Sequence, residues 1–129
     1  MAAVIGVKRA VQEIALDDSP DSPVFTLDLS DKAIARDFER ITRLYGSVVA
    51  LSDGMRDDAD YTVGRQMALA SVERKIITAI LGEEAYAAII GYVACGKPAH
   101  ECNLILLPLL EYLFGQIKAV VTANDSAAV

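Results

Sequence analysis

The sequence predicts a mainly helical protein, a bundle of about four helices preceded by a short N-terminal β-hairpin; an α+β description is also possible. Three observations predict this. Apolar residues recur at three- and four-residue spacing from about residue 30 onward, glycine and proline interrupt that pattern, and strand-like alternation is confined to the N-terminal part. The length of 129 residues suits one domain. We expect a single domain over 1–123 and a flexible tail over 124–129.

The hairpin is expected within residues 10–29. Its second strand, 24–29, alternates apolar Phe25, Leu27 and Leu29 with polar residues. Its first strand, 11–16, is less certain, because apolar residues there also fit helical spacing. The run DDSPDSP between the two is rich in turn-forming residues, which predicts a longish connecting loop.

The first two helices are expected on either side of an acidic loop. The first should begin after Ser30, whose hydroxyl can cap the first turn, and end at about Ser52. The loop 53–60 holds four aspartates, but their spacing is not that of a calcium-binding EF-hand. The second helix should run from about residue 60 or 61 to Leu81, with Glu73 among its solvent-facing residues. Gly82 should end it, because glycine takes left-handed backbone conformations cheaply.

Two further helices complete the expected bundle. One runs from residue 83 to about Ala94, with two glutamates in its first turn. The other follows a Gly-Lys-Pro break and runs from Pro98 to about Ala123, with a kink near Pro108. The last helix is apolar on more than one side, so we expect one stripe in the core and a second against a partner. The expected core stripe is Leu106, Leu109, Leu113 and Ile117, and the expected partner-binding residues are Leu107, Leu110 and Phe114.

Composition narrows the classes of partner. The net charge is −6 and the basic residues are scattered, which argues against nucleic acid. The last helix carries Pro108, Glu111, Gln116 and Lys118, so a buried helix is favoured over a membrane span. The N-terminus does not read as a secretory signal, which predicts a cytoplasmic protein. A mean hydropathy of +0.34 predicts exposed apolar patches and therefore self-association or a protein partner.

Candidate chemistry is sparse. Cys95, His100 and Cys102 form the only cluster with metal-ligand side chains, but a structural zinc site usually has four protein ligands. A thiol- or metal-dependent regulatory module is therefore kept as an alternative, and packed cysteines beside a helical histidine are the plainer interpretation. The sequence holds no phosphate-binding glycine loop and no nucleophile elbow. We expect no enzymatic activity and no cofactor.

One family resemblance follows from the element order and one junction. The stretch LDLSDKAIARDFERI, a second helix, the junction ILGEEAYAAIIG over residues 80–91 and an apolar last helix resemble the tail assembly chaperones of long-tailed bacteriophages and prophages. Asn103 resembles an asparagine that those proteins place before the last helix. Glu84 stands where a second glycine is usual, and Ile90 where an aromatic residue is common.

The resemblance implies a mainly helical, self-associating protein. It would bind the tape measure protein, keep that protein soluble, and assist assembly of the tail tube protein around it. It would act in the cytoplasm of the bacterial host and be absent from the mature virion. A self-associating helical adaptor unrelated to phages is the other interpretation of the same features.

Overall fold

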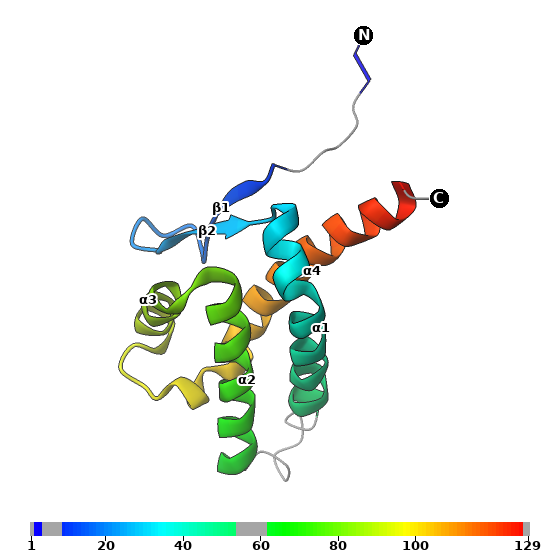
Figure 1. The fold of residues 1–129 in the computed structure, drawn as a ribbon. Helices are drawn as coiled ribbons and strands as arrows, with labels where there is room; N and C mark the ends of the chain where they lie inside the picture. Colours follow the sequence, from blue (N-terminus) through cyan, green and yellow to red (C-terminus); the bar gives the residue numbers. More distant parts are fainter. Residues whose placement is uncertain (1, 4–8, 54–61, 128–129) are drawn as a thin grey trace.

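The computed structural model describes residues 2–3, 9–53 and 62–127, with side chains described as far as residue 122 (Figure 1). Within these ranges, a two-stranded antiparallel hairpin precedes four α-helices. This confirms the predicted fold class. The helices α1 and α2 lie side by side, and α4 packs against both (Figure 1).

The hairpin consists of β1 (Val11–Ala15) and β2 (Val24–Asp28), within a residue of the predicted bounds. Ile14 is paired with Phe25, and both are buried. Leu27 is fully buried, whereas Thr26 and Asp28 are exposed, so the two-residue alternation places one face of the sheet on the core. The strand reading of residues 11–15 is therefore confirmed over the helical one.

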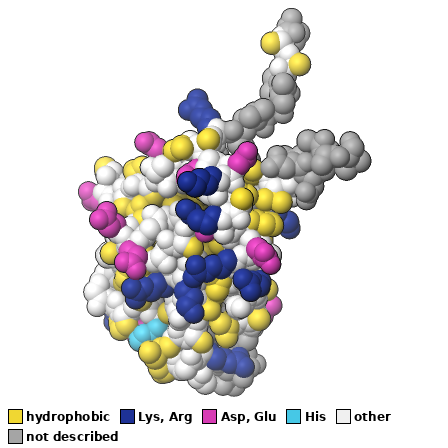
Figure 2. All heavy atoms as spheres, in the orientation of Figure 1, with side chains coloured by type: hydrophobic (Ala, Val, Ile, Leu, Met, Phe, Trp, Pro, Cys, Tyr) yellow, Lys and Arg dark blue, Asp and Glu magenta, His cyan; other side chains and the backbone are white. Residues whose placement is uncertain are grey.

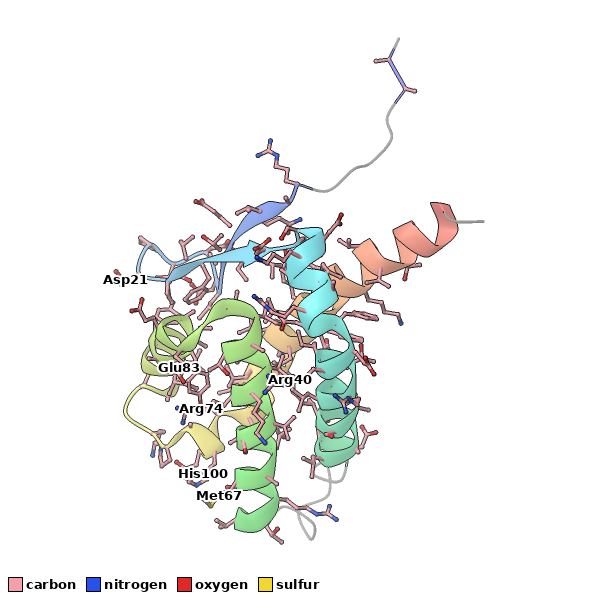
Figure 3. All side chains as sticks on the ribbon, viewed as in Figure 1. Asp21, Arg40, Met67, Arg74, Glu83 and His100 are labelled. Carbon is pink, nitrogen blue, oxygen red and sulfur yellow. The ribbon has the colours of Figure 1, made fainter. Side chains whose placement is uncertain are left out.

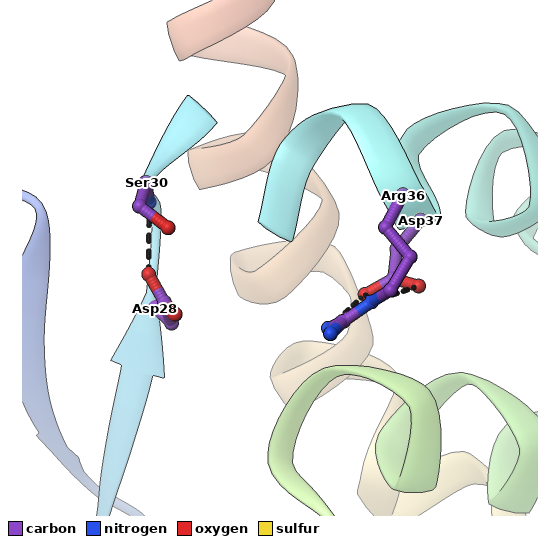
Figure 4. A network of polar contacts seen from close by, with 4 residues as sticks. All are labelled: Asp28, Ser30, Arg36 and Asp37. Atoms are coloured by element: carbon purple, nitrogen blue, oxygen red, sulfur yellow. Dashed lines mark hydrogen bonds and ion pairs between the residues drawn. The ribbon is translucent and has the colours of Figure 1, made fainter. Parts of the chain in front are cut away.

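Helix α1 (Asp31–Asp53) begins where the sequence predicts. The Ser30 carbonyl accepts the Ile34 N–H at 3.0 Å, and the Asp28 carboxylate accepts the Ser30 N–H at 2.9 Å (Figure 4). The Asp28 carboxylate accepts hydrogen bonds from the Ser30 N–H and from the Ser30 hydroxyl, and these two bonds lower its pKa. The backbone at the helix start is therefore fixed by an aspartate two residues upstream. Farther along, Arg36 and Asp37 form a surface ion pair at 2.7 Å (Figure 4).

Helices α2 (Val63–Leu81) and α3 (Glu83–Ala94) meet at Gly82. The Thr62 hydroxyl caps α2 by accepting the Arg65 N–H at 3.2 Å; the start predicted at residues 60–61 lies outside the described residues. Gly82 has φ 97° and ψ 164°, so its φ is positive as predicted but its ψ is extended rather than helical.

The beginning of the last helix differs from the prediction. Cys95, with φ 50° and ψ 44°, ends α3 in the left-handed conformation. Pro98 does precede a helical turn, but that turn is a short 3-10 helix, η2 (Ala99–Glu101). Helix α4 (Asn103–Ala127) begins only after it and continues four residues beyond the expected end. Proline's fixed φ suits either kind of helix, so it cannot specify which one follows.

The core lies where one stripe of α4 meets α1, α2 and the hairpin. The α4 stripe is buried at every member, and it faces equally buried side chains from α1 and α2. The α4 residues are Leu106, Leu110, Leu113 and Ile117, and the facing residues are Ile41, Val48, Leu69, Ile76 and Ile77. Burial of each such side chain contributes about 1.5–3 kcal/mol.

Helix α4 is also unusually apolar along its length. Residues Asn103–Thr122 are long and apolar enough to cross a membrane by length and composition alone, with a mean hydropathy of 1.7. In the 18-residue apolar window of that stretch 22% of the residues are buried, and these are the four core side chains of α4. The remaining apolar side chains of α4 are its unusual feature.

Gly82 and Gly91 form a matched pair for testing the α2–α3 junction. An added Cβ would meet no atom within 4 Å at either position, but only Gly82 has a positive φ. We expect Gly82→Ala to destabilise the fold by about 1–3 kcal/mol through backbone strain. Gly91→Ala, inside α3, should stabilise it by about 0.5–1 kcal/mol. Urea unfolding followed by circular dichroism measures both, and a neutral Gly82→Ala would contradict the described junction.

Candidate functional site

An open hollow of about 570 Å³ lies between β1, α3 and α4. It is the best candidate for a binding site among the described residues, because its wall is mainly apolar. Strand β1 and the residues after it form one wall, α3 contributes Tyr92 and Val93, and α4 forms the other. The α4 lining residues are Ile105, Leu106, Pro108, Leu109 and Tyr112. We call this hollow the β1–α4 groove.

The α4 side of the groove is an exposed apolar stripe. Ile105 is 63% exposed and Tyr112 is 43% exposed, and half-buried Leu109 lies between them. With Pro108, these residues occupy positions i, i+3, i+4 and i+7, which share one face of a helix. Apolar side chains that stay exposed at this spacing are typical of a surface that packs against another apolar segment.

The rim of the groove is polar and mostly acidic. The Tyr92 hydroxyl donates to the Asp17 carboxylate, with distances of 2.7 and 3.0 Å to its two oxygens. This hydrogen bond raises the pKa of the Tyr92 hydroxyl. On the other side, the Tyr112 hydroxyl lies 3.4 Å from the Gln12 side-chain oxygen, and the carboxylate of Glu13 is exposed nearby. The rim therefore presents carboxylates beside an apolar floor.

Opposite charge gathers on another face of the molecule. Figure 2 shows Lys and Arg side chains concentrated over α1 and α2, and Figure 3 places Arg40 and Arg74 there. The basic residues of these two helices are Lys32, Arg36, Arg40, Arg43, Arg65, Arg74 and Lys75. Arg74 lies over the Tyr86 ring, 5.3 Å from its centroid. We call the surface over α1 and α2 that Figure 2 shows the basic face.

The three α4 residues predicted to contact a partner, Leu107, Leu110 and Phe114, are buried or half-buried in the structure. Leu110 is fully buried, so its expected place at the border of a second contact surface is wrong. Phe114 and Leu107 are half-buried and pack on the core, and Phe114 stacks on Tyr45 with ring centroids 4.4 Å apart. Leu109, expected in the core, is half-buried: it packs against the core and also lines the groove. Leu109 and Leu110 are consecutive residues of α4, so their side chains point in different directions and only that of Leu110 is fully buried. Partner binding itself stays a prediction.

A buried carboxylate is the main polar feature that the sequence analysis missed. Glu73 is 1% exposed, and neither of its oxygens has a hydrogen-bond partner in the structure. Burial raises its pKa from 4.5 to about 8, so the side chain is mostly protonated at neutral pH. Leu69, Glu73, Ile76 and Ile77 share one face of α2, so helical spacing alone carried a signal that Glu73 points inward.

A second buried polar side chain lies at the start of α4. The Asn103 amide donates to the Gln66 carbonyl of α2 at 2.7 Å, while its own side-chain oxygen has no partner in the structure. This bond ties the first turn of α4 to the first half of α2. The asparagine singled out by the family resemblance therefore has a structural role that its burial explains.

The cysteine and histidine cluster is not assembled as a metal site. Cys95 is exposed and Cys102 is buried, and both are free thiols. Each points to a local carbonyl: the Cys95 thiol to that of Tyr92, the Cys102 thiol to that of Pro98. Among the residues the structure describes, no three histidine, cysteine or acidic side chains gather closely enough to hold a metal ion. His100 belongs to η2, which packs against α2 near Met67 (Figure 3).

Comparison with known proteins adds no family to this description. No protein-family model, no curated protein and no solved structure matches the chain.

The pKa of Glu73 predicts an unusual dependence of stability on pH. Between pH 4.5 and about 8, the folded protein keeps a proton that the unfolded chain releases. The free energy of unfolding should therefore fall as pH rises through this window, by up to about 1.4 kcal/mol per pH unit. Glu73→Gln should remove this slope, because an amide does not titrate. Glu83→Gln, at an exposed position, is the control and should keep it. Urea unfolding at pH 5, 6, 7 and 8 measures the slopes; equal slopes in Glu73→Gln and the unmodified protein would refute the assignment.

Proposed function

We propose that this protein is a tail assembly chaperone of a long-tailed bacteriophage or prophage. In this proposal it binds the tape measure protein in the host cytoplasm, keeps that partner soluble and assists assembly of the tail tube protein around it. The observation that carries the proposal is the β1–α4 groove, a partly exposed apolar surface on an otherwise ordinary helical bundle. The resemblance of residues 80–91 and Asn103 to such chaperones supplies the identity of the partner.

The shape of the groove favours an amphipathic helix as the bound segment. Ile105, Leu109 and Tyr112 form a stripe along two turns of α4, and ridges at this spacing pack into the side-chain rows of another helix. A helix that lays its apolar face into a groove is a common mode of recognition. The Ile105 side chain is 63% exposed, so a bound helix that covers it would remove apolar surface from water.

Charge favours a particular kind of helix. Glu13 and Asp17 lie beside the apolar floor, so a bound segment with Lys or Arg beside its apolar stripe would be attracted to the rim. The protein's own net charge of −6 would then help to keep the complex in solution. Both properties suit a protein that keeps a long apolar partner from aggregating.

The test is co-expression with a tape measure protein from a long-tailed phage. The chaperone should increase the soluble fraction of that partner and elute with it on size exclusion. Ile105→Glu should abolish the effect and weaken binding by at least about tenfold, because it places a charge against apolar surface. Val63→Glu is the matched control, since Val63 is a β-branched residue on α2 with an exposed fraction of 62%.

Two results would contradict the proposal for the partner tested. One is the absence of a complex with the unmodified protein. The other is equal loss of binding in Ile105→Glu and Val63→Glu, which would move the binding surface away from the groove. Binding of unrelated amphipathic helices with equal affinity would instead support the general helical adaptor.

A further inference from the structure

Helix α3 is held less firmly than the other three helices. Of its 12 residues, all of which the structure describes, only Ile89 and Ala94 are buried. Each of the helices α1, α2 and α4 buries at least four side chains. Because burial of apolar surface is what mainly holds an element in place, α3 is the helix whose displacement costs least.

Both ends of α3 are breaks in the helical backbone with positive φ. Gly82, before the helix, has φ 97°, and Cys95 and Gly96, after it, have φ 50° and 87°. Hinge motions concentrate their changes in backbone angle at a few such positions between elements. Helix α3 can therefore turn away from its neighbours as a rigid unit, without unwinding α2 or η2.

The packing of α3 on α2 covers the buried carboxyl group of Glu73. Burial raises the pKa of the Tyr86 hydroxyl of α3; Arg74 opposes this shift, and the charge of Glu73 adds to it. Burial also raises the pKa of the Cys102 thiol, just before α4, with a smaller contribution from Glu73. Glu73 therefore lies within electrostatic reach of both α3 and the start of α4.

Nothing among the described residues offsets a charge on Glu73. Neither of its oxygens has a hydrogen-bond partner, and burial is the one cause of its raised pKa. No cation of α1, α3, η2, α4 or the hairpin thus stabilises its ionised form, and Arg74, the next residue of α2, lies over the Tyr86 ring. The ionised side chain must reach water, and displacing α3 is the route that gives up the least buried surface.

We propose that α3 is a hinged flap, and that opening of this flap exposes Glu73 to water and releases its proton. The open flap also withdraws Tyr92 and Val93, so the β1–α4 groove loses one wall. In the closed state the Tyr92 hydroxyl ties the flap to the Asp17 carboxylate at the rim of the groove. Proton release and access to the groove are thus coupled.

The coupling fixes how flap opening depends on pH. In the closed state Glu73 has a pKa of about 8, whereas in the open state, in water, it returns to its ordinary pKa of 4.5. Between these two values opening releases one proton, so the equilibrium constant for opening rises about tenfold per pH unit. Opening should therefore become about a hundredfold more frequent from pH 5.5 to pH 7.5.

Amide hydrogen exchange of the full-length protein at pH 5.5, 6.5 and 7.5 tests the proposal. Protection factors, which remove the intrinsic effect of pH on exchange, should be lower at residues 83–94 than in the middle turns of α1 and α4. In α3 they should fall about a hundredfold over this range in the unmodified protein. Glu111→Gln, at an exposed position outside α3, is the control and should show the same fall. In Glu73→Gln they should not change with pH, because an amide does not titrate.

A third variant tests whether α3 moves as a unit. Tyr92→Phe removes the hydrogen bond to Asp17 and should lower the protection factors of α3 about two- to tenfold at every pH. The factor should be the same from the first to the last hydrogen-bonded turn of the helix, and the dependence on pH should persist. An effect confined to the last turn would show fraying and would contradict a rigid flap.

The unmodified protein alone can overturn the proposal, so the test does not depend on the folding of Glu73→Gln. Protection of α3 that is independent of pH would show that the helix opens without exposing Glu73. Protection of α3 as high as that of α1 would show that only global unfolding reaches this carboxyl group. The same fall with pH in Glu73→Gln would assign it to another group. No tape measure protein is involved, so none of these results decides the proposed chaperone function.

Discussion

Burial of one stripe of α4 against α1 and α2 is the interaction on which the rest of the structure depends. Leu106, Leu110, Leu113 and Ile117 fill the space between the first two helices and the hairpin. Because α4 is apolar on several sides, burying this stripe in the core leaves a second apolar stripe of the same helix at the surface. Ile105, Leu109 and Tyr112 belong to that outer stripe, and β1 and α3 border it. The candidate site is thus a consequence of how the longest helix meets its neighbours.

The same packing explains the buried carboxylate. Glu73 occupies a core position of α2 between Leu69 and Ile76, where a charged group would have no water to solvate it. The fold tolerates it by holding it in the neutral form, at a pKa of about 8. Asn103, on the neighbouring helix, is buried as well and is tied to α2 through Gln66. The junction of α2 with the start of α4 is therefore the polar part of an otherwise apolar core.

Much of the fold follows from local sequence patterns, and the differences have identifiable causes. The two-residue alternation of β2 and the position of Ser30 predict the hairpin and the start of α1, because both depend on neighbouring residues only. The sequence predicts Leu109 in the core and Leu110 at a contact surface, whereas it is Leu110 that is fully buried. Both are apolar, and only tertiary packing decides which one faces the core. Glu73 was assigned to the surface by its charge, although its spacing placed it on the apolar face. The groove combines residues from β1, α3 and α4, and no pattern within one segment encodes that arrangement.

The central claim is that the β1–α4 groove is where this protein binds apolar segments. Hydrogen–deuterium exchange of the protein with and without a bound tape measure fragment tests it most directly. The account predicts slower exchange at residues 11–17 and 104–112 on binding, and unchanged exchange over the basic face of α1 and α2. Protection of residues 32–43 and 65–75, with unchanged exchange along β1 and the first half of α4, would contradict it.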